Sequence, residues 1–127
     1  MQIEKQVCSL SLAKELKQNG YPQTEGVWWW AWKEEHYCLT EKVLEGEPTL
    51  VAGFPPYDFP YTGIVAPTVS ELGERLPDGY RTLKINNIWM ALSPNKVVPI
   101  KWAEANTEAN ARCKMLLYLV KEGLIKW

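Results

Sequence analysis

The sequence offers one pair of side chains with the types of a nucleophile and its base. His36 is the only histidine, and Cys38 follows two positions later in a β-prone stretch, so both would lie on one face of a strand. A histidine that accepts the proton of a cysteine produces a reactive thiolate. Side chains at positions i and i+2 of a strand are, however, about 6 to 7 Å apart, which is too far for that hydrogen bond. We therefore interpret His36 as a surface histidine and Cys38 as an ordinary strand cysteine.

Carboxylates gather in the same part of the chain, at Glu34, Glu35, Glu41, Glu45 and Glu47. Paired carboxylates can act as general acid and base or cleave glycosidic bonds. Along a hairpin they are more typical of solvated residues that keep strand edges from pairing with other chains. We favour this second interpretation.

Metal and cofactor motifs are missing from the sequence. Cys8, Cys38 and Cys113 are widely spaced, without a CxxC pair or metal-ligand spacing, so we expect reduced thiols and no metal site. Gly-rich phosphate loops and the G-x-S-x-G and H-E-x-x-H patterns are also absent. We predict a protein that is not an enzyme and that binds no cofactor.

Charge and length limit the class of protein further. Fourteen basic and fifteen acidic residues give a net charge of −1, which removes the simplest electrostatic argument for nucleic acid or an anionic membrane. The N-terminus is polar, and the longest apolar stretch, near residues 115–120, is too short to cross a bilayer. We expect a cytoplasmic protein, with residues 1–127 forming a single domain.

Four of the seven tryptophans fall within five residues, at Trp28, Trp29, Trp30 and Trp32. In a strand, Trp28, Trp30 and Trp32 would line one face, and Trp29 the other. Either the strand is packed on both faces inside a sheet, which we favour, or one aromatic stripe is kept for a partner. If residues 34 and 35 formed a two-residue turn between strands 27–33 and 36–44, Tyr37 would lie opposite Trp32 and widen the stripe.

A second aromatic group lies in the segment Gly53–Gly63, which holds three prolines and four aromatic residues. Prolines at that density favour an extended loop over a helix or a paired strand. The rings either pack over the sheet edge, which we favour, or form a recognition surface. Together the two groups give the candidate binding residues Trp28, Trp30, Trp32, Tyr37, Phe54, Tyr57, Phe59 and Tyr61.

Three helices are expected, each with an end signal. The first, about residues 9–19, has Ser9 as N-cap and Gly20 as stop. The second begins at a Thr68-x-x-Glu71 capping box and closes by residue 76. The third runs from residue 106 or 107 to 123, with Ala109, Cys113, Leu116 and Val120 on its buried face.

Three short strands, about residues 80–85, 88–92 and 97–102, are expected between the second and third helices. Asn86-Asn87 is a turn former, and Pro99 indicates an edge or a bulge in the last strand. With the tryptophan hairpin, the order becomes α-β-β-α-β-β-β-α. The sequence thus predicts an α+β fold: an antiparallel sheet of about five strands, hairpin plus meander, packed with three helices.

Three blocks of the sequence, residues 8–17, 66–77 and 105–119, resemble small uncharacterised proteins of bacteriophages, prophages and related mobile elements. They occur in the same order and span most of the chain. The resemblance implies an accessory protein that acts inside a bacterial cell. It implies no activity and assigns no catalytic or binding residue.

The leading hypothesis from the sequence is a non-enzymatic module that contacts a protein partner, or a copy of itself, through its aromatic residues. The alternative is that the same rings bind single-stranded nucleic acid or a carbohydrate. Stacking sites for single strands combine rings with a positively charged groove. Glutamates share the tryptophan hairpin with Lys33 and Lys42, which disfavours nucleic acid.

Overall fold

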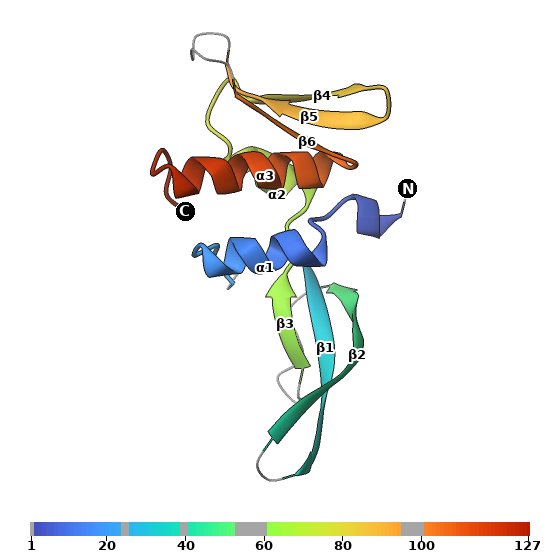
Figure 1. Cartoon of the computed structure of the whole chain (residues 1–127). Coiled ribbons are helices and arrows are strands. Elements are labelled where there is room, and N and C mark those ends of the chain that lie inside the picture. The colour runs from blue at the N-terminus through green and yellow to red at the C-terminus, as the bar shows by residue number, and fades with distance from the viewer. Residues whose placement is uncertain (1, 24–25, 39–40, 53–60, 95–100) are drawn as a thin grey trace.

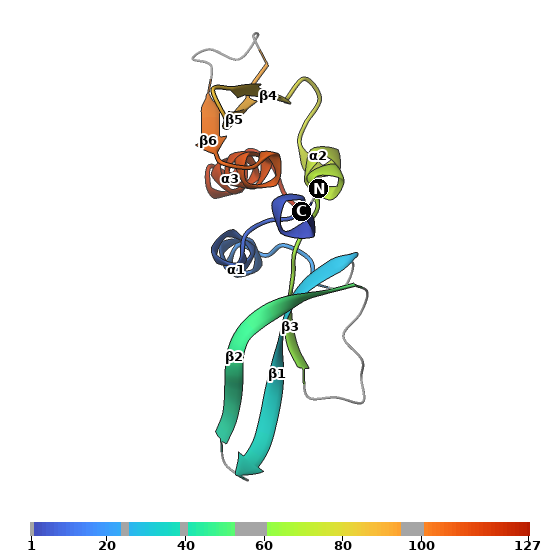
Figure 2. The same ribbon diagram turned by 90° about the vertical axis from the view of Figure 1, so that its right-hand side faces the viewer.

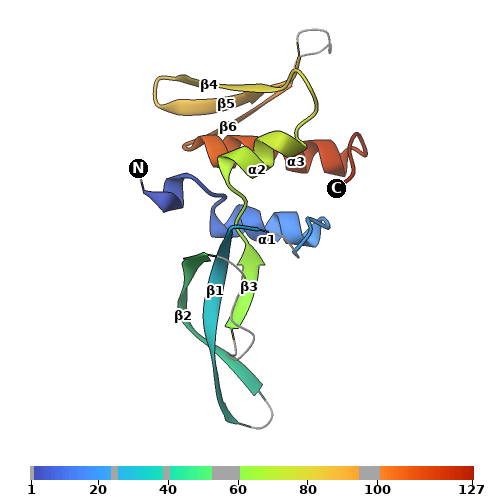
Figure 3. The same cartoon turned by 180° about the vertical axis from the view of Figure 1, so that it is seen from behind.

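Three helices lie between two antiparallel sheets in the computed structural model of the 127-residue chain (Figure 1). The structure describes residues 2–23, 26–38, 41–52, 61–94 and 101–127. For residues 32–38, 41–49, 51, 61 and 62 it describes the backbone alone. One sheet extends away from the helices, and the other lies over the opposite side of the helical layer (Figures 1 and 3).

The extended sheet contains β1 (Trp28–Cys38), β2 (Glu41–Ala52) and β3 (Tyr61–Val65), in the order β2-β1-β3. The turn expected at residues 34 and 35 is wrong, because Glu34 pairs with Leu44 inside a continuous β1, and the chain reverses between Cys38 and Glu41. A Glu-Glu pair lacks the backbone preferences of a tight turn, and strand preference depends on the pairing partner. Trp32 and Tyr37 therefore share one strand instead of facing each other.

Two further features of this sheet concern an irregularity in β2 and the proline-rich segment that follows β2. Ala31 pairs with Thr49 and Lys33 with Glu45, so β2 carries two extra residues among 46–48, where Gly46 and Pro48 lie. A bulge on an edge strand is where a residue without a backbone donor is accepted. The segment expected to be an irregular loop, 53–63, ends in strand β3, while residues 53–60 lie outside the described part.

The second sheet contains β4 (Arg81–Ile85), β5 (Ile88–Leu92) and β6 (Trp102–Ala105), in sequence order. Asn86 and Asn87 adopt φ values of 50° and 64°, the left-handed pair of a two-residue hairpin turn, which confirms the expected turn. β6 begins at Trp102, where the expected third strand ends. Residues 97–100 of that strand, with Pro99, lie outside the described residues.

The helices match the sequence closely because their ends carry local signals. α1 (Leu10–Gln18) is capped by Ser9, and α2 (Val69–Arg75) has the full capping box of Thr68 and Glu71. α3 (Glu108–Lys121) is capped by Thr107. A short 3-10 helix, η1 (Ile3–Lys5), precedes α1 and has no counterpart among the expected elements.

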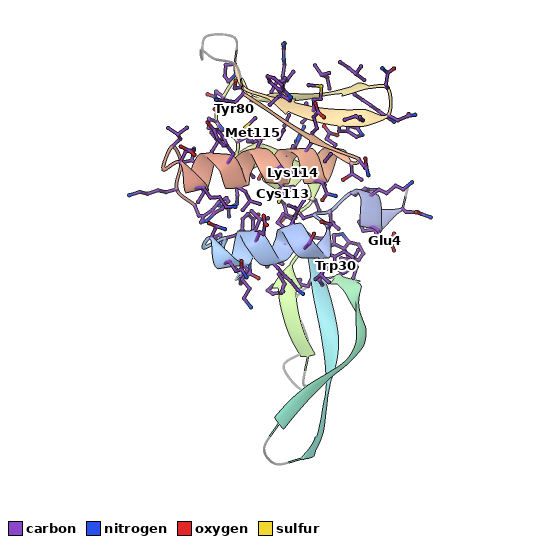
Figure 4. The ribbon with its side chains drawn as sticks, in the orientation of Figure 1. Glu4, Trp30, Tyr80, Cys113, Lys114 and Met115 are labelled. Carbon is purple, nitrogen blue, oxygen red and sulfur yellow. The ribbon has the colours of Figure 1, made fainter. Side chains whose placement is uncertain are left out.

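α3 has two buried faces, whereas the sequence predicts one. Ala109, Cys113 and Leu116 pack toward α1 and the ends of β1 and β3, as expected. Met115, with Ala111 and Leu119, forms a second core with the sheet β4-β5-β6. Figure 4 shows Met115 directed toward that sheet and Cys113 on the side of α1. α3 is therefore the central element between the two sheets.

The α+β class and the antiparallel pairing are confirmed. The helices and strands follow the expected order, with β3 as an additional strand. The strands are divided between two three-stranded sheets instead of forming one sheet of about five. Each sheet therefore has two faces of its own. The faces that the helices do not cover are the candidate contact surfaces.

Candidate contact surface

The inner face of the sheet β4-β5-β6 rests on α3. Thr82 of β4 donates a hydrogen bond to the carboxylate of Glu108 on α3. Trp89, Ala103 and Ala105 pack around the second core that α3 shares with the buried Ala91. Because paired residues of an antiparallel ladder share a face, these contacts fix which side chains point inward.

The opposite face, here called the outer face, carries large apolar side chains. The strand register pairs Leu83 with Met90, Ile85 with Ile88, and Leu92 with Trp102, each one position away from an inward residue. Trp102 is 58% exposed, Ile85 53% and Ile88 41%, while Leu83, Met90 and Leu92 are half-buried. No described helix or strand lies over this side of the sheet (Figures 1 and 2). The outer face is defined by Arg81, Leu83, Ile85, Ile88, Met90, Leu92, Trp102 and Glu104.

The distribution of sizes across this sheet is the reverse of the usual one. The inner face holds three alanines and a threonine, with Trp89 and Lys84 near its hairpin end, while the outer face holds leucine, isoleucine, methionine and tryptophan. Small residues on both surfaces let α3, with Ala111, approach the sheet closely. Monomeric proteins seldom leave a contiguous apolar patch of this kind in water, and such patches mark sites of interaction.

Two opposite charges border the outer face. Arg81 begins β4 at one edge of the sheet, and Glu104 lies in β6 at the other edge, and both are exposed. The face therefore has an apolar centre with one positive and one negative border. That composition resembles the apolar core and polar rim of protein interfaces.

The tryptophan strand is divided between core and partial exposure. Trp29 is 4% exposed and belongs to the core beneath α1. Trp30 packs against the same core, and its indole Nε1 donates a 2.9 Å hydrogen bond to the carbonyl oxygen of Cys8 (Figure 4). Trp28 is half-buried. β1 is the central strand of its sheet, which is the arrangement that we favour from the sequence.

The candidate aromatic stripe is therefore not an open surface over its described length. Trp30 is a member of the candidate stripe, but its hydrogen bond to Cys8 joins β1 to the segment before α1. The side chains of Trp32, Tyr37 and Tyr61 lie outside the described part, as do all atoms of Phe54, Tyr57 and Phe59. Those six residues remain sequence-based candidates.

His36 is not brought to either buried cysteine. Along β1 it lies six residues beyond Trp30, the residue that bonds to Cys8. Six residues of strand span about 20 Å. The strand containing His36 thus carries it away from the helices and from the thiols of Cys8 and Cys113.

Cys8 and Cys113 form a buried pair of free thiols between the N-terminal segment and α3. Burial, together with the hydrogen-bonding thiol of Cys113, raises the pKa of the Cys8 thiol well above its usual value. The Sγ atom of Cys113 also lies 4.0 Å from the carbonyl oxygen of Leu12. A thiol whose pKa is raised by burial is a poor nucleophile at neutral pH, so the Cys8 thiol is a packing group.

Grooves border the helices, and in two of them several polar groups are engaged within the chain. The first, of about 460 Å³, lies between α1, α3 and β6 and adjoins the outer face at Ile88 and Glu104. In it Asn110 accepts from the backbone N–H of Ser9, and Lys114 donates to the carbonyl oxygen of Glu104. The second, of about 410 Å³, contains Lys84 with its Nζ 5.9 Å from the centre of the Trp89 ring. These contacts hold elements of the fold together.

Metal ligands do not cluster in the described part of the chain, where no group of three His, Cys, Asp or Glu side chains could hold an ion. Among the described residues, no helix has the length and apolar character needed to cross a membrane. No family model, curated protein or solved structure matches the chain. The resemblance to phage and prophage proteins stays a prediction.

Proposed function

We propose that this chain is a non-enzymatic protein-interaction module that binds a protein surface through the outer face of the sheet β4-β5-β6. The observation that carries the proposal is the orientation of that sheet, with its small residues against α3 and its large apolar residues directed away from the core. The proposal keeps the class of function expected from the sequence and moves the contact surface from the tryptophan strand to a different sheet.

The chemistry of the outer face favours a protein as the partner. Leu83, Ile85, Met90 and Leu92 are aliphatic or thioether side chains, which pack against other apolar side chains. Sites for single-stranded nucleic acid require several stacking rings and a positively charged groove. On this face Trp102 is the single ring, and Arg81 is balanced by Glu104.

The resemblance to phage and prophage proteins supplies the setting of the proposal. It supports an accessory role in the cytoplasm of a bacterial host cell. A small non-catalytic protein in that setting acts by occupying the surface of another molecule.

Removing the apolar character of the outer face should abolish binding without unfolding the chain. In the double variant Met90→Gln/Trp102→Gln, the free energy of unfolding should change by less than about 1 kcal/mol, because both side chains point away from the core. Loss of the Trp102 ring together with the apolar side chain of Met90 in the middle strand should weaken association by a factor of about 30 or more. Urea denaturation measures the first effect, and sedimentation of the purified protein and of cell extract containing it measures the second.

The matched control is Val27→Gln/Leu124→Gln, which replaces two apolar residues that are 56% and 64% exposed elsewhere on the chain. This control should keep every association of the wild type. The proposal is wrong if the outer-face variant unfolds, since the face would then be core. It is also wrong if that variant retains all associations.

A further inference from the structure

We infer that the partner of the outer face is a second copy of this chain, packed sheet on sheet about a two-fold axis. The inference rests on the proposed function and adds the identity of the partner. It is carried by the positions of the two charged residues on the face, Arg81 and Glu104, relative to the apolar residues between them.

The strand register places the outer-face residues in rows across the sheet. Arg81 on β4 lies beside Leu92 on β5, which lies beside Trp102 on β6. The next row is Leu83, Met90 and Glu104. On the outer face, the positive charge of Arg81 is therefore on the β4 edge, and the carboxylate of Glu104 and the large ring are on the β6 edge. The amine of Lys114 on α3 bonds to the backbone carbonyl of Glu104 beneath that edge.

A two-fold axis parallel to β5 makes this pattern complementary to itself. Rotation about such an axis places β4 of one copy over β6 of the other while keeping each row over itself. Arg81 of each copy then meets Trp102 of the other, with Glu104 one row away. A guanidinium group can stack on an indole ring and pair with a carboxylate at the same time. Both contacts occur twice, as in any closed interface between identical chains.

The apolar rows between these charges would form the centre of a sandwich. Two sheets packed face to face are about 10 Å apart with strands inclined by about 30°. Met90 lies in the middle strand, between the charged edges, and would be close to the axis. The apolar residues of both copies would then be removed from water together.

The size of the face sets the expected strength of the dimer. Eight side chains on three short strands can bury about 500 Å² per copy, or about 1,000 Å² in total, at the lower limit for a specific interface. Interfaces of that size are transient, so we expect a dimer that dissociates on dilution through the micromolar range.

The balance of charge on the face selects against other kinds of partner. A strongly acidic or basic surface would place like charges against either Glu104 or Arg81, which is costly at an interface. A second copy carries one charge of each sign at the complementary edges. A second copy of the chain therefore satisfies both borders.

Charge reversal tests the inference. In Arg81→Glu, two carboxylates of different copies meet at each edge, and in Glu104→Arg, two guanidinium groups meet. Each variant alone should dimerise at least about tenfold more weakly than the wild type in sedimentation equilibrium. An equimolar mixture of the two variants should dimerise as the wild type does, because each edge of the mixed pair then joins a carboxylate of one copy to a guanidinium group of the other.

The matched control is Lys84→Glu, which makes the same change of charge on the same strand but on the inner side of the sheet. It should leave the dimer unchanged. A wild-type protein that stays monomeric up to about 500 μM would overturn the inference, and so would a mixture of the two variants that fails to dimerise. If the wild type is monomeric while Met90→Gln/Trp102→Gln loses a complex with another protein, the inference fails and the proposed function stands.

Discussion

Trp29→Ala should lower the free energy of unfolding by about 3 to 5 kcal/mol, the range for removing a large aromatic side chain from a core. Trp29 is 4% exposed and packs in the cluster that joins α1 and α3 to the ends of β1 and β3. It is where the extended sheet attaches to the helices. Domains have a total stability of about 5 to 15 kcal/mol, so this one change should leave a marginally folded protein.

Its neighbour Trp28 provides the control in urea denaturation. Trp28 is half-buried and on the opposite face of β1, so Trp28→Ala should cost less than about 1.5 kcal/mol. Trp30→Phe keeps an aromatic ring and removes the bond to the carbonyl oxygen of Cys8, for a loss of about 1 kcal/mol. Equal losses at Trp28 and Trp29 would contradict this division of the strand between core and surface.

Arg112→Ala should lower the free energy of unfolding by about 2 to 3 kcal/mol, because the Arg112 guanidinium contacts residues of α2, α3 and β4. Its Nη1 donates to the carbonyl oxygen of Val69 in α2 at 2.8 Å. Its Nη2 lies 3.1 Å from the carboxylate of Glu108 and 3.4 Å from the hydroxyl of Thr82 in β4. Hydrogen bonds to charged groups are worth about 1.5 to 3 kcal/mol, and the loss of this one donor group also leaves the Val69 carbonyl without that bond.

The substitution Gly73→Ala tests whether the position of the Arg112 guanidinium contributes to stability. A Cβ atom at residue 73 would overlap Nη1 of Arg112, so Gly73→Ala must displace the guanidinium from Val69. In the wild type this loss should offset the gain of about 1 kcal/mol that alanine brings to a helix. In the Arg112→Ala protein, Gly73→Ala should raise the free energy of unfolding by the full value of about 1 kcal/mol. An identical effect of Gly73→Ala in both backgrounds, measured by urea denaturation, would show that the two positions are independent.

The parts of the fold that the sequence predicts well are those with local causes. Ser9, Thr68 with Glu71, and Thr107 each satisfy backbone donors within three residues, so the helix starts can be read directly. The Asn86-Asn87 turn is equally local. Pairing between distant segments is different, because no local signal says that β3 joins β1 or that the strands separate into two sheets.

The hairpin of β1 and β2 is a second case in which strand pairing could not be predicted from local sequence. Two glutamates inside β1 interrupt its apolar pattern and suggest a boundary, yet the pairing of Glu34 with Leu44 continues through them. The strand is extended by its partner, and strand preference depends on such context. A turn needs residues with special backbone conformations, and Glu-Glu does not provide them.

Sequence reasoning misses the outer face because residue size is a poor guide to burial in this chain. Trp28, Trp30 and Trp32 form the candidate aromatic stripe, whereas Trp30 packs against the core. In β6 the sequence Trp-Ala-Glu-Ala alternates, and the alanines turn inward. The signal is present in the alanines of β5 and β6 and in Ala111 of α3, since a helix packs closely against a sheet where both surfaces are small.

Oxidation of methionine by dilute hydrogen peroxide, followed by mass spectrometry, tests the outer face most directly. Met90 lies on that face and Met115 is 1% exposed beneath the inner face, so each protein molecule contains its own reference. Below the dissociation range, Met90 should oxidise at least about tenfold faster than Met115, and at high protein concentration its rate should fall while that of Met115 stays low. Equal and slow oxidation of both residues in dilute protein would contradict an uncovered outer face.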